Sequence, residues 1–75
     1  MNRRPVSSAN ILSVGWQESE EGSSGGTLEV AFRSGHIYSY ANVPESTYRQ
    51  LLGASSVGKT FNATIKDRYE EQRVA

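Results

Sequence analysis

Three segments of the chain have the apolar pattern of β-strands. The clearest is 27–33, where Leu28, Val30 and Phe32 lie on one side of an extended chain and polar residues lie on the other. A shorter apolar run at 11–16 precedes it, and a glycine inside that run indicates a bulge or a closely approaching backbone. Residues 20–26 contain no apolar side chain and predict a loop. A third run, 36–44, follows the second after a short turn.

The turn before the third strand decides which face of the sheet carries its two tyrosines. A two-residue turn would require a positive φ at a serine, which is unfavourable, and would place the tyrosines on the polar face. A three-residue turn with a left-handed Gly35 has no such cost. It pairs Val30 with Tyr38 and Leu28 with Tyr40, so that both tyrosines join the apolar face. We favour this second register, and the first is the alternative.

The segment after the third strand predicts a short helix. Pro44 suits its start, because proline fixes a helical φ and has no N–H to leave unpaired. Tyr48, Leu51 and Leu52 then form an apolar stripe at helical spacing, and Gly53 ends it.

A second helix is predicted directly afterwards, capped by Ser55 or Ser56. Apolar residues recur there every four positions, at Val57, Phe61, Ile65 and Tyr69. A rival alternation within 61–66 would instead give a strand, but it covers fewer residues.

The expected fold is therefore α+β, with a small three-stranded antiparallel sheet followed by two C-terminal helices. The tail, 70–75, either adds a short final edge strand or stays loose. Residues 1–8 are expected to be a flexible N-terminus, and 9–75 a single domain. Because so small a chain buries only about 60% of its unfolded surface, its core needs most of its large apolar residues. Trp16 is expected to be partly buried, with its indole N–H bonded to an edge partner.

Composition excludes several classes of site. The chain has 75 residues, with eight basic and eight acidic side chains, no cysteine and one histidine. Neutral net charge gives no overall attraction to nucleic acid or to anionic lipid. Without cysteine there is no disulfide, thiol catalysis or thiolate metal site, and no metal or cofactor is expected. The two arginines near the start precede no apolar run, so we expect a cytoplasmic protein without a membrane segment.

Residues 53–60 match the phosphate-loop pattern G-x-x-x-x-G-K-[ST]. A phosphate loop follows a buried strand, whereas the preceding segment here has a helical pattern. We interpret these residues as a helix end followed by a helix cap, and weak anion binding at that helix start stays open. His36 has no predictable nucleophile or carboxylate partner, so no catalytic group is expected and the protein is predicted not to be an enzyme.

Basic residues accumulate towards the C-terminus, where acidic residues are interleaved with them. Lys59, Lys66 and Arg68 are the strongest candidates for nucleic-acid contacts. A solvated helix face accounts for the same charges and is the favoured interpretation.

Taken in order, three patterns resemble the KTSC domain: S-S-x-x-I-x-x-V-G-W at 7–16, L-x-V-x-F-x-x-G-x-I-Y-x-Y-x-x-V-P at 28–44, and A-S-x-x-G-x-x-F-N-x-x-I-K-x-x-Y at 54–69. The resemblance covers about 7–74. That family is named after a C-terminal extension of some lysyl-tRNA synthetases and also occurs as small bacterial and phage proteins. Its Y-x-Y pattern corresponds to Tyr38 and Tyr40. This chain departs from it in having Trp16 where tyrosine is common, and in lacking a synthetase domain.

The resemblance implies a small non-enzymatic binding module with RNA as the candidate ligand. Lys59, Lys66 and Arg68 would then contact phosphates, and Tyr38 or Tyr40 would stack on bases only in the alternative hairpin register. The alternative function is a protein-interaction or adaptor domain that binds no nucleic acid. The sequence leaves the partner and the oligomeric state open.

Overall fold

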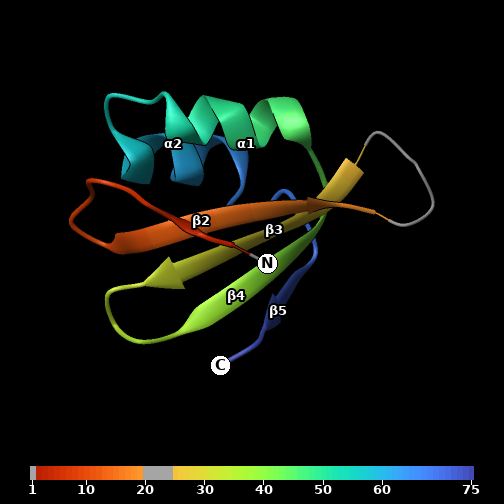
Figure 1. Cartoon of the computed structure of the whole chain (residues 1–75), viewed down its shortest axis with the longest axis horizontal. Helices are drawn as coiled ribbons and strands as arrows, with labels where there is room; N and C mark the ends of the chain where they lie inside the picture. The colour runs from red at the N-terminus through yellow and green to blue at the C-terminus, as the bar shows by residue number, and fades with distance from the viewer. Residues whose placement is uncertain (1, 20–24) are drawn as a thin grey trace.

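A single antiparallel sheet carries both helices on one of its faces (Figure 1). This computed structural model describes residues 2–19 and 25–75, and within them the sheet has five strands in the order β1-β2-β3-β4-β5. The strands are β1 Arg4–Pro5, β2 Ile11–Glu18, β3 Gly25–Phe32, β4 Ile37–Pro44 and β5 Glu71–Arg73. The helices are α1 Glu45–Leu52 and α2 Val57–Thr64. The predicted α+β class is confirmed, and its three main strands are β2, β3 and β4.

The β3–β4 hairpin has the favoured register. Val30 pairs with Tyr38 and Leu28 pairs with Tyr40. Gly35 has a φ of +100°, and the N–H of Phe32 donates to the carbonyl of His36 at 2.9 Å across the turn. The turn therefore uses the conformational freedom of glycine, and both tyrosines lie on the side of the sheet that faces the core.

Strand β1 lies in the segment for which the sequence predicts only a flexible N-terminus. It pairs with β2, with Arg4 opposite Val14. Just before it, the chain passes so close to Gly15 that a Cβ there would lie 2.7 Å from the carbonyl oxygen of Asn2. The predicted close backbone neighbour of this glycine is thereby confirmed. An ion pair between Arg3 and Glu29 of β3 also ties the N-terminus to the sheet.

Helix α2 is shorter than its apolar repeat predicts. The predicted extension to Tyr69 is wrong, because the helix ends at Thr64. The N–H groups of both Ile65 and Lys66 donate to the carbonyl of Phe61, and Asp67 then takes a left-handed φ of 62°. This reverses the chain and leads it into β5, so Tyr69 packs against the core from the connection and not from the helix.

Strand β5 confirms the predicted final edge strand. It pairs with β4, with Arg73 opposite Tyr38 and Glu71 opposite Tyr40. The ladder continues past its end, since Val74 donates its N–H to the carbonyl of Ile37 at 2.7 Å.

The core lies between the sheet and the two helices. Its buried members are Ile11, Val14, Leu28, Val30, Tyr40, Val43, Leu51, Val57, Phe61 and Ile65. Trp16 packs against this cluster while half-buried, and its Nε1–H donates to the carbonyl of Val43 at 2.8 Å. The expected environment of the indole is thus confirmed. Neither helix in the described part of the chain has the length and apolar character needed to cross a membrane.

Candidate functional site

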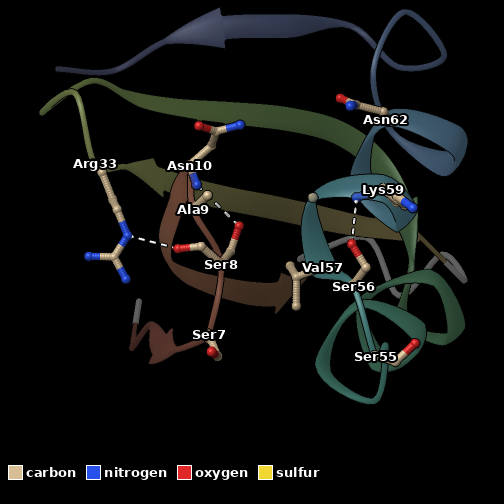
Figure 2. A pocket seen from close by; sticks show the side chains of 11 residues that line it. Ser7, Ser8, Ala9, Asn10, Arg33, Ser55, Ser56, Val57, Lys59 and Asn62 are labelled. Atoms are coloured by element: carbon tan, nitrogen blue, oxygen red, sulfur yellow. Dashed lines mark hydrogen bonds between the residues drawn. The ribbon is translucent and has the colours of Figure 1, made fainter.

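A polar pocket of about 550 Å³ lies where residues 7–10 approach the first turn of α2. Figure 2 shows Arg33 on one side of it, next to Ser8, and Lys59 on the other side. The two walls are distant in sequence and are brought together because α2 packs on the face of the sheet next to the start of β2. We call this cavity the polar pocket.

Hydrogen bonds fix the wall formed by residues 7–10. The Ser8 hydroxyl accepts from the backbone N–H groups of Asn10 and Ile11 at 3.3 and 3.2 Å. The Arg33 Nε–H donates to the Ser8 carbonyl at 2.9 Å, and the Arg33 backbone N–H donates to the Asn10 carbonyl at the same distance. Because four bonds hold this short segment, its remaining side chains project from a defined backbone.

The opposite wall is the segment that matches the phosphate-loop pattern. Gly53 caps the end of α1, and Ser56 is the N-cap of α2, where its hydroxyl accepts from the backbone N–H of Lys59 at 3.4 Å. A helix, and not a buried strand, precedes the pattern. The interpretation as a helix end followed by a helix cap is therefore confirmed.

An aromatic pocket of about 260 Å³ adjoins the polar pocket. The two share Asn10, Gly58 and Asn62 among their lining residues. Four aromatic rings line this second cavity, together with Lys66 and Glu71; the rings are those of Phe32, Tyr38, Tyr40 and Phe61. A third hollow, of about 410 Å³, continues towards the β3–β4 turn and shares Phe32, Tyr38 and Asn10. We call the three cavities together the α2 groove.

Edge-to-face contacts hold the rings of the aromatic pocket. Phe61 contacts both Phe32 and Tyr40 with ring centroids 5.7 Å apart, and Tyr38 lies 5.8 Å from Phe32. Tyr40 and Phe61 are only 2% and 6% exposed, whereas Phe32 and Tyr38 are half-buried. The first two therefore form the floor, and the second two present part of their surface to the groove.

Tyr40 has its hydroxyl at the edge of this pocket, where it donates to Glu71 Oε1 at 2.8 Å. Burial raises the pKa of Tyr40 above its ordinary range, and the hydrogen bond to Glu71 and the negative charge of that carboxylate raise it further. The phenol stays protonated, and it also links β4 to β5.

The predicted site residues separate into two groups. Lys59 is exposed and lines the polar pocket, and Lys66 is exposed and lines the aromatic pocket. Arg68 is exposed too, but it lines none of the three cavities, and its Nε–H donates to the carbonyl of Ala63 at 2.8 Å. Since the hairpin has the favoured register, the condition on which Tyr38 and Tyr40 would form a stacking platform on the open face of the sheet is not met.

Asn10, Arg33 and Asn62 also line the groove, and none of them was among the predicted contact residues. Asn62 could have been found, because it stands three positions after Lys59 and four before Lys66, the spacing of one helix face. Asn10 and Arg33 carry no such signal, since only the folded chain brings them to α2.

The groove is locally cationic although the chain as a whole is neutral. Arg33, Lys59 and Lys66 line its three cavities. Among the described residues that line them, Glu71 alone carries a negative charge, and that carboxylate already accepts the Tyr40 hydroxyl. An anionic ligand is thus better suited to this surface than to the molecule on average.

Comparison with known proteins gives consistent matches. The KTSC domain family matches residues 7–69. An uncharacterised protein of Stutzerimonas stutzeri is 33% identical over 69 residues, which cover 92% of this chain and 90% of that protein. A lysine–tRNA ligase of Nostoc punctiforme is 37% identical over 49 residues, which are 65% of this chain but only 9% of the ligase.

The fold is also similar to that of a solved structure. The crystal structure of a KTSC domain protein from Yersinia pestis has a TM-score of 0.87 and 32% sequence identity, covering 99% of this chain and 97% of the other. The family match extends over most of the sheet and both helices, including all the residues that line the α2 groove except Glu71. This chain therefore belongs to the KTSC domain family.

Proposed function

We propose that this protein is a non-enzymatic RNA-binding module and that the α2 groove is its RNA-binding surface. One observation carries the proposal: Arg33 from the β3–β4 turn and two lysines from the α2 segment, Lys59 and Lys66, line adjoining cavities of a neutral chain next to partly exposed aromatic rings. Proteins that bind single strands combine these two features, because the cations contact phosphates and the rings contact bases.

The relatives favour RNA over other anions. One of them is a lysine–tRNA ligase, which by its name acts on a transfer RNA, and this chain is similar to a small part of it. We infer that the shared module binds RNA in both settings. We propose that Arg33, which lines the polar pocket, contacts a phosphate in place of Arg68.

The non-enzymatic part of the proposal rests on how the polar groups of the groove are used. The hydroxyls of Ser8 and Ser56 accept backbone N–H groups, and His36 is absent from the described lining of the three cavities. This use of the two hydroxyls supports a binding role, and we propose that the groove does not combine a nucleophile, a base and a group that orients the base.

The alternative function, a protein-interaction or adaptor domain, has weaker support. Binding by strand addition needs a long free edge, whereas β1 and β5 are two and three residues long. Leu12 and Val74 are exposed apolar residues, 47% and 56% accessible, but they are far apart in the fold's strand order, on β2 and beyond β5.

The test is a fluorescence-anisotropy titration of a labelled single-stranded RNA of about ten nucleotides. If three cations contact phosphates, the logarithm of the affinity should fall with the logarithm of salt concentration with a slope of about −2. Affinity should then drop roughly 15- to 20-fold between about 50 and about 200 mM salt. Lys59→Gln and Lys66→Gln should each reduce the slope by about 0.7.

Arg68→Gln is the matched control, because it removes an exposed cation that lies outside the three cavities. We expect it to leave affinity and slope unchanged. Wild-type protein that binds no RNA at low salt, or an equal loss in Arg68→Gln and Lys59→Gln, would contradict the proposed function.

A further inference from the structure

We infer that the aromatic pocket is a subsite for one unpaired RNA base, with the side-chain amides of Asn10 and Asn62 contacting the base edge. Lys59 and Lys66 would contact the phosphates on either side. This inference rests on the proposed function and adds to it the state of the RNA and the residues that read a base.

The shape and polarity of the aromatic pocket suit a planar base. Its floor consists of the almost completely buried rings of Tyr40 and Phe61, and its wall contains the partly buried rings of Phe32 and Tyr38. The polar side chains of Asn10, Asn62, Lys66 and Glu71 also line it. Small-ligand sites combine a concave apolar surface with a few polar groups that orient the ligand. A planar base has this same division, with apolar faces and a polar edge.

Some of the polar groups that line the α2 groove are already used within the fold. The guanidinium of Arg33 and the hydroxyl of Tyr40 donate hydrogen bonds within the protein. By contrast, no hydrogen bond joins the side-chain amide of Asn10 or of Asn62 to any residue in 2–19 or 25–75. Each amide offers two donors and one acceptor, and the edge of a nucleobase is composed of the same groups.

A lysine lies on each side of the junction between the two pockets. Asn10 and Asn62 line both pockets, so they stand at the junction between them. Lys59 lies on the polar side of this junction and Lys66 on the aromatic side. A base held at the junction would thus have one cation available for each neighbouring phosphate. This arrangement favours a nucleotide within a strand over an uncharged aromatic ligand.

The buried rings of the aromatic pocket also favour unpaired over paired RNA. Two of the four rings that line the aromatic pocket, those of Tyr40 and Phe61, are almost completely buried, so we expect that a base reaches them only after leaving its stack. Bases in a duplex are paired and stacked, and the A-form grooves expose mainly backbone. We therefore expect binding of single strands and of unpaired nucleotides, with little binding of a blunt duplex.

The experiment compares four single-stranded RNA homo-oligomers of about ten nucleotides with a blunt RNA duplex of similar length, all at low salt. Wild type should prefer at least one homo-oligomer over another by about fivefold or more, and the duplex should compete poorly. Tyr38→Leu should weaken binding of the single strand by about tenfold through loss of the ring. Asn62→Ala, on the exposed surface of α2, should remove most of the base preference while salt dependence stays.

Tyr48→Leu is the matched control for the ring. Tyr48 is also half-buried against the core, stacks on Trp16 at a centroid distance of 6.4 Å, and lines none of the three cavities. We expect RNA binding to be unchanged, and thermal unfolding of each variant checks that it is folded.

The outcomes separate this inference from the proposed function. Salt-dependent RNA binding that is indifferent to Asn62→Ala and Tyr38→Leu, or equal affinity for duplex and single strand, would overturn the base subsite and leave the RNA-binding function standing. Absence of any RNA binding at low salt would overturn both.

Discussion

Tyr40 illustrates how one residue can connect several parts of this small protein. Its ring contributes to the core and to the floor of the aromatic pocket, while its hydroxyl donates to Glu71 of β5. The edge strand is thereby attached to β4 by a side-chain bond as well as by the backbone ladder. Removing the hydroxyl should therefore affect stability and leave the aromatic floor in place.

Tyr40→Phe tests this link through its pH dependence. At neutral pH the variant should lose about 1 kcal/mol of unfolding free energy, the typical net value of one hydrogen bond. The pKa of Tyr40 is raised in the folded protein, so the folded state keeps a proton that the unfolded state releases above a pH of about 10. The stabilisation is complete below that pH and falls above it, by at most about 1.4 kcal/mol per pH unit.

The measurement is urea denaturation of wild type and Tyr40→Phe between neutral pH and a pH of about 11. The stability gap between the two proteins should shrink as the pH rises, because only wild type loses the contribution of the phenol. A double-mutant cycle with Glu71→Ala supplies the control. Fully additive effects of the two substitutions at neutral pH would show that the bond contributes nothing to stability.

The start of α2 shows how one local sequence fits two different elements. Residues 53–60 satisfy a nucleotide-binding pattern, yet Gly53 ends one helix and Ser56 caps the next. The preceding element distinguishes a phosphate loop from a helix end followed by a helix cap. Helix α1 precedes this segment, whereas a phosphate loop would need a strand there.

Ser56→Ala tests the cap assignment, for which the sequence leaves Ser55 and Ser56 as alternatives. Loss of the bond from the Lys59 N–H should cost about 0.5–1 kcal/mol, the lower part of the range for N-caps, because the bond is long at 3.4 Å. Ser55→Ala, at an exposed position, should change stability by less than about 0.5 kcal/mol. Chemical denaturation of both variants makes the comparison, and a larger loss in Ser55→Ala would reverse the assignment.

For the molecule as a whole, the contact between helices and sheet depends on few side chains. Phe61 joins α2 to two strands through its edge contacts with Phe32 and Tyr40. In a domain of this size a single such ring represents a large part of the available stability, which we place at about 4–11 kcal/mol from typical values per residue.

Phe61→Ala should lower the free energy of unfolding by about 3–5 kcal/mol through lost burial and a residual cavity. A substantial unfolded population is expected at moderate temperature, measurable by circular dichroism and by urea denaturation. Leu12→Ala is the control: that side chain is 47% exposed, so its loss should cost less than about 1 kcal/mol. Similar losses in the two variants would show that the core does not depend on this ring.

The sequence was sufficient for features that depend on neighbours along the chain. The alternation in 27–33 predicted β3, and the conformational preference of Gly35 predicted the turn and hence the pairing of Val30 with Tyr38. Local patterns also predicted the capped start of α2. Its end was beyond such patterns, because the apolar repeat continues to Tyr69 while a left-handed Asp67 and the pairing of β5 reverse the chain earlier.

Part of the candidate site could also be predicted from local sequence patterns. Lys59 and Lys66 stand out in the sequence as cations on one segment, and both line the groove. Asn10 and Arg33 stand out in no local pattern, because they come from a loop and a turn that meet α2 only when it packs on the sheet. Periodicity and turn chemistry act over a few residues, so the sequence determined the strands, the turn and the helix starts. The packing of α2 against residues 7–10 depends on contacts between distant segments, and only the tertiary structure decided that a polar and an aromatic pocket adjoin there.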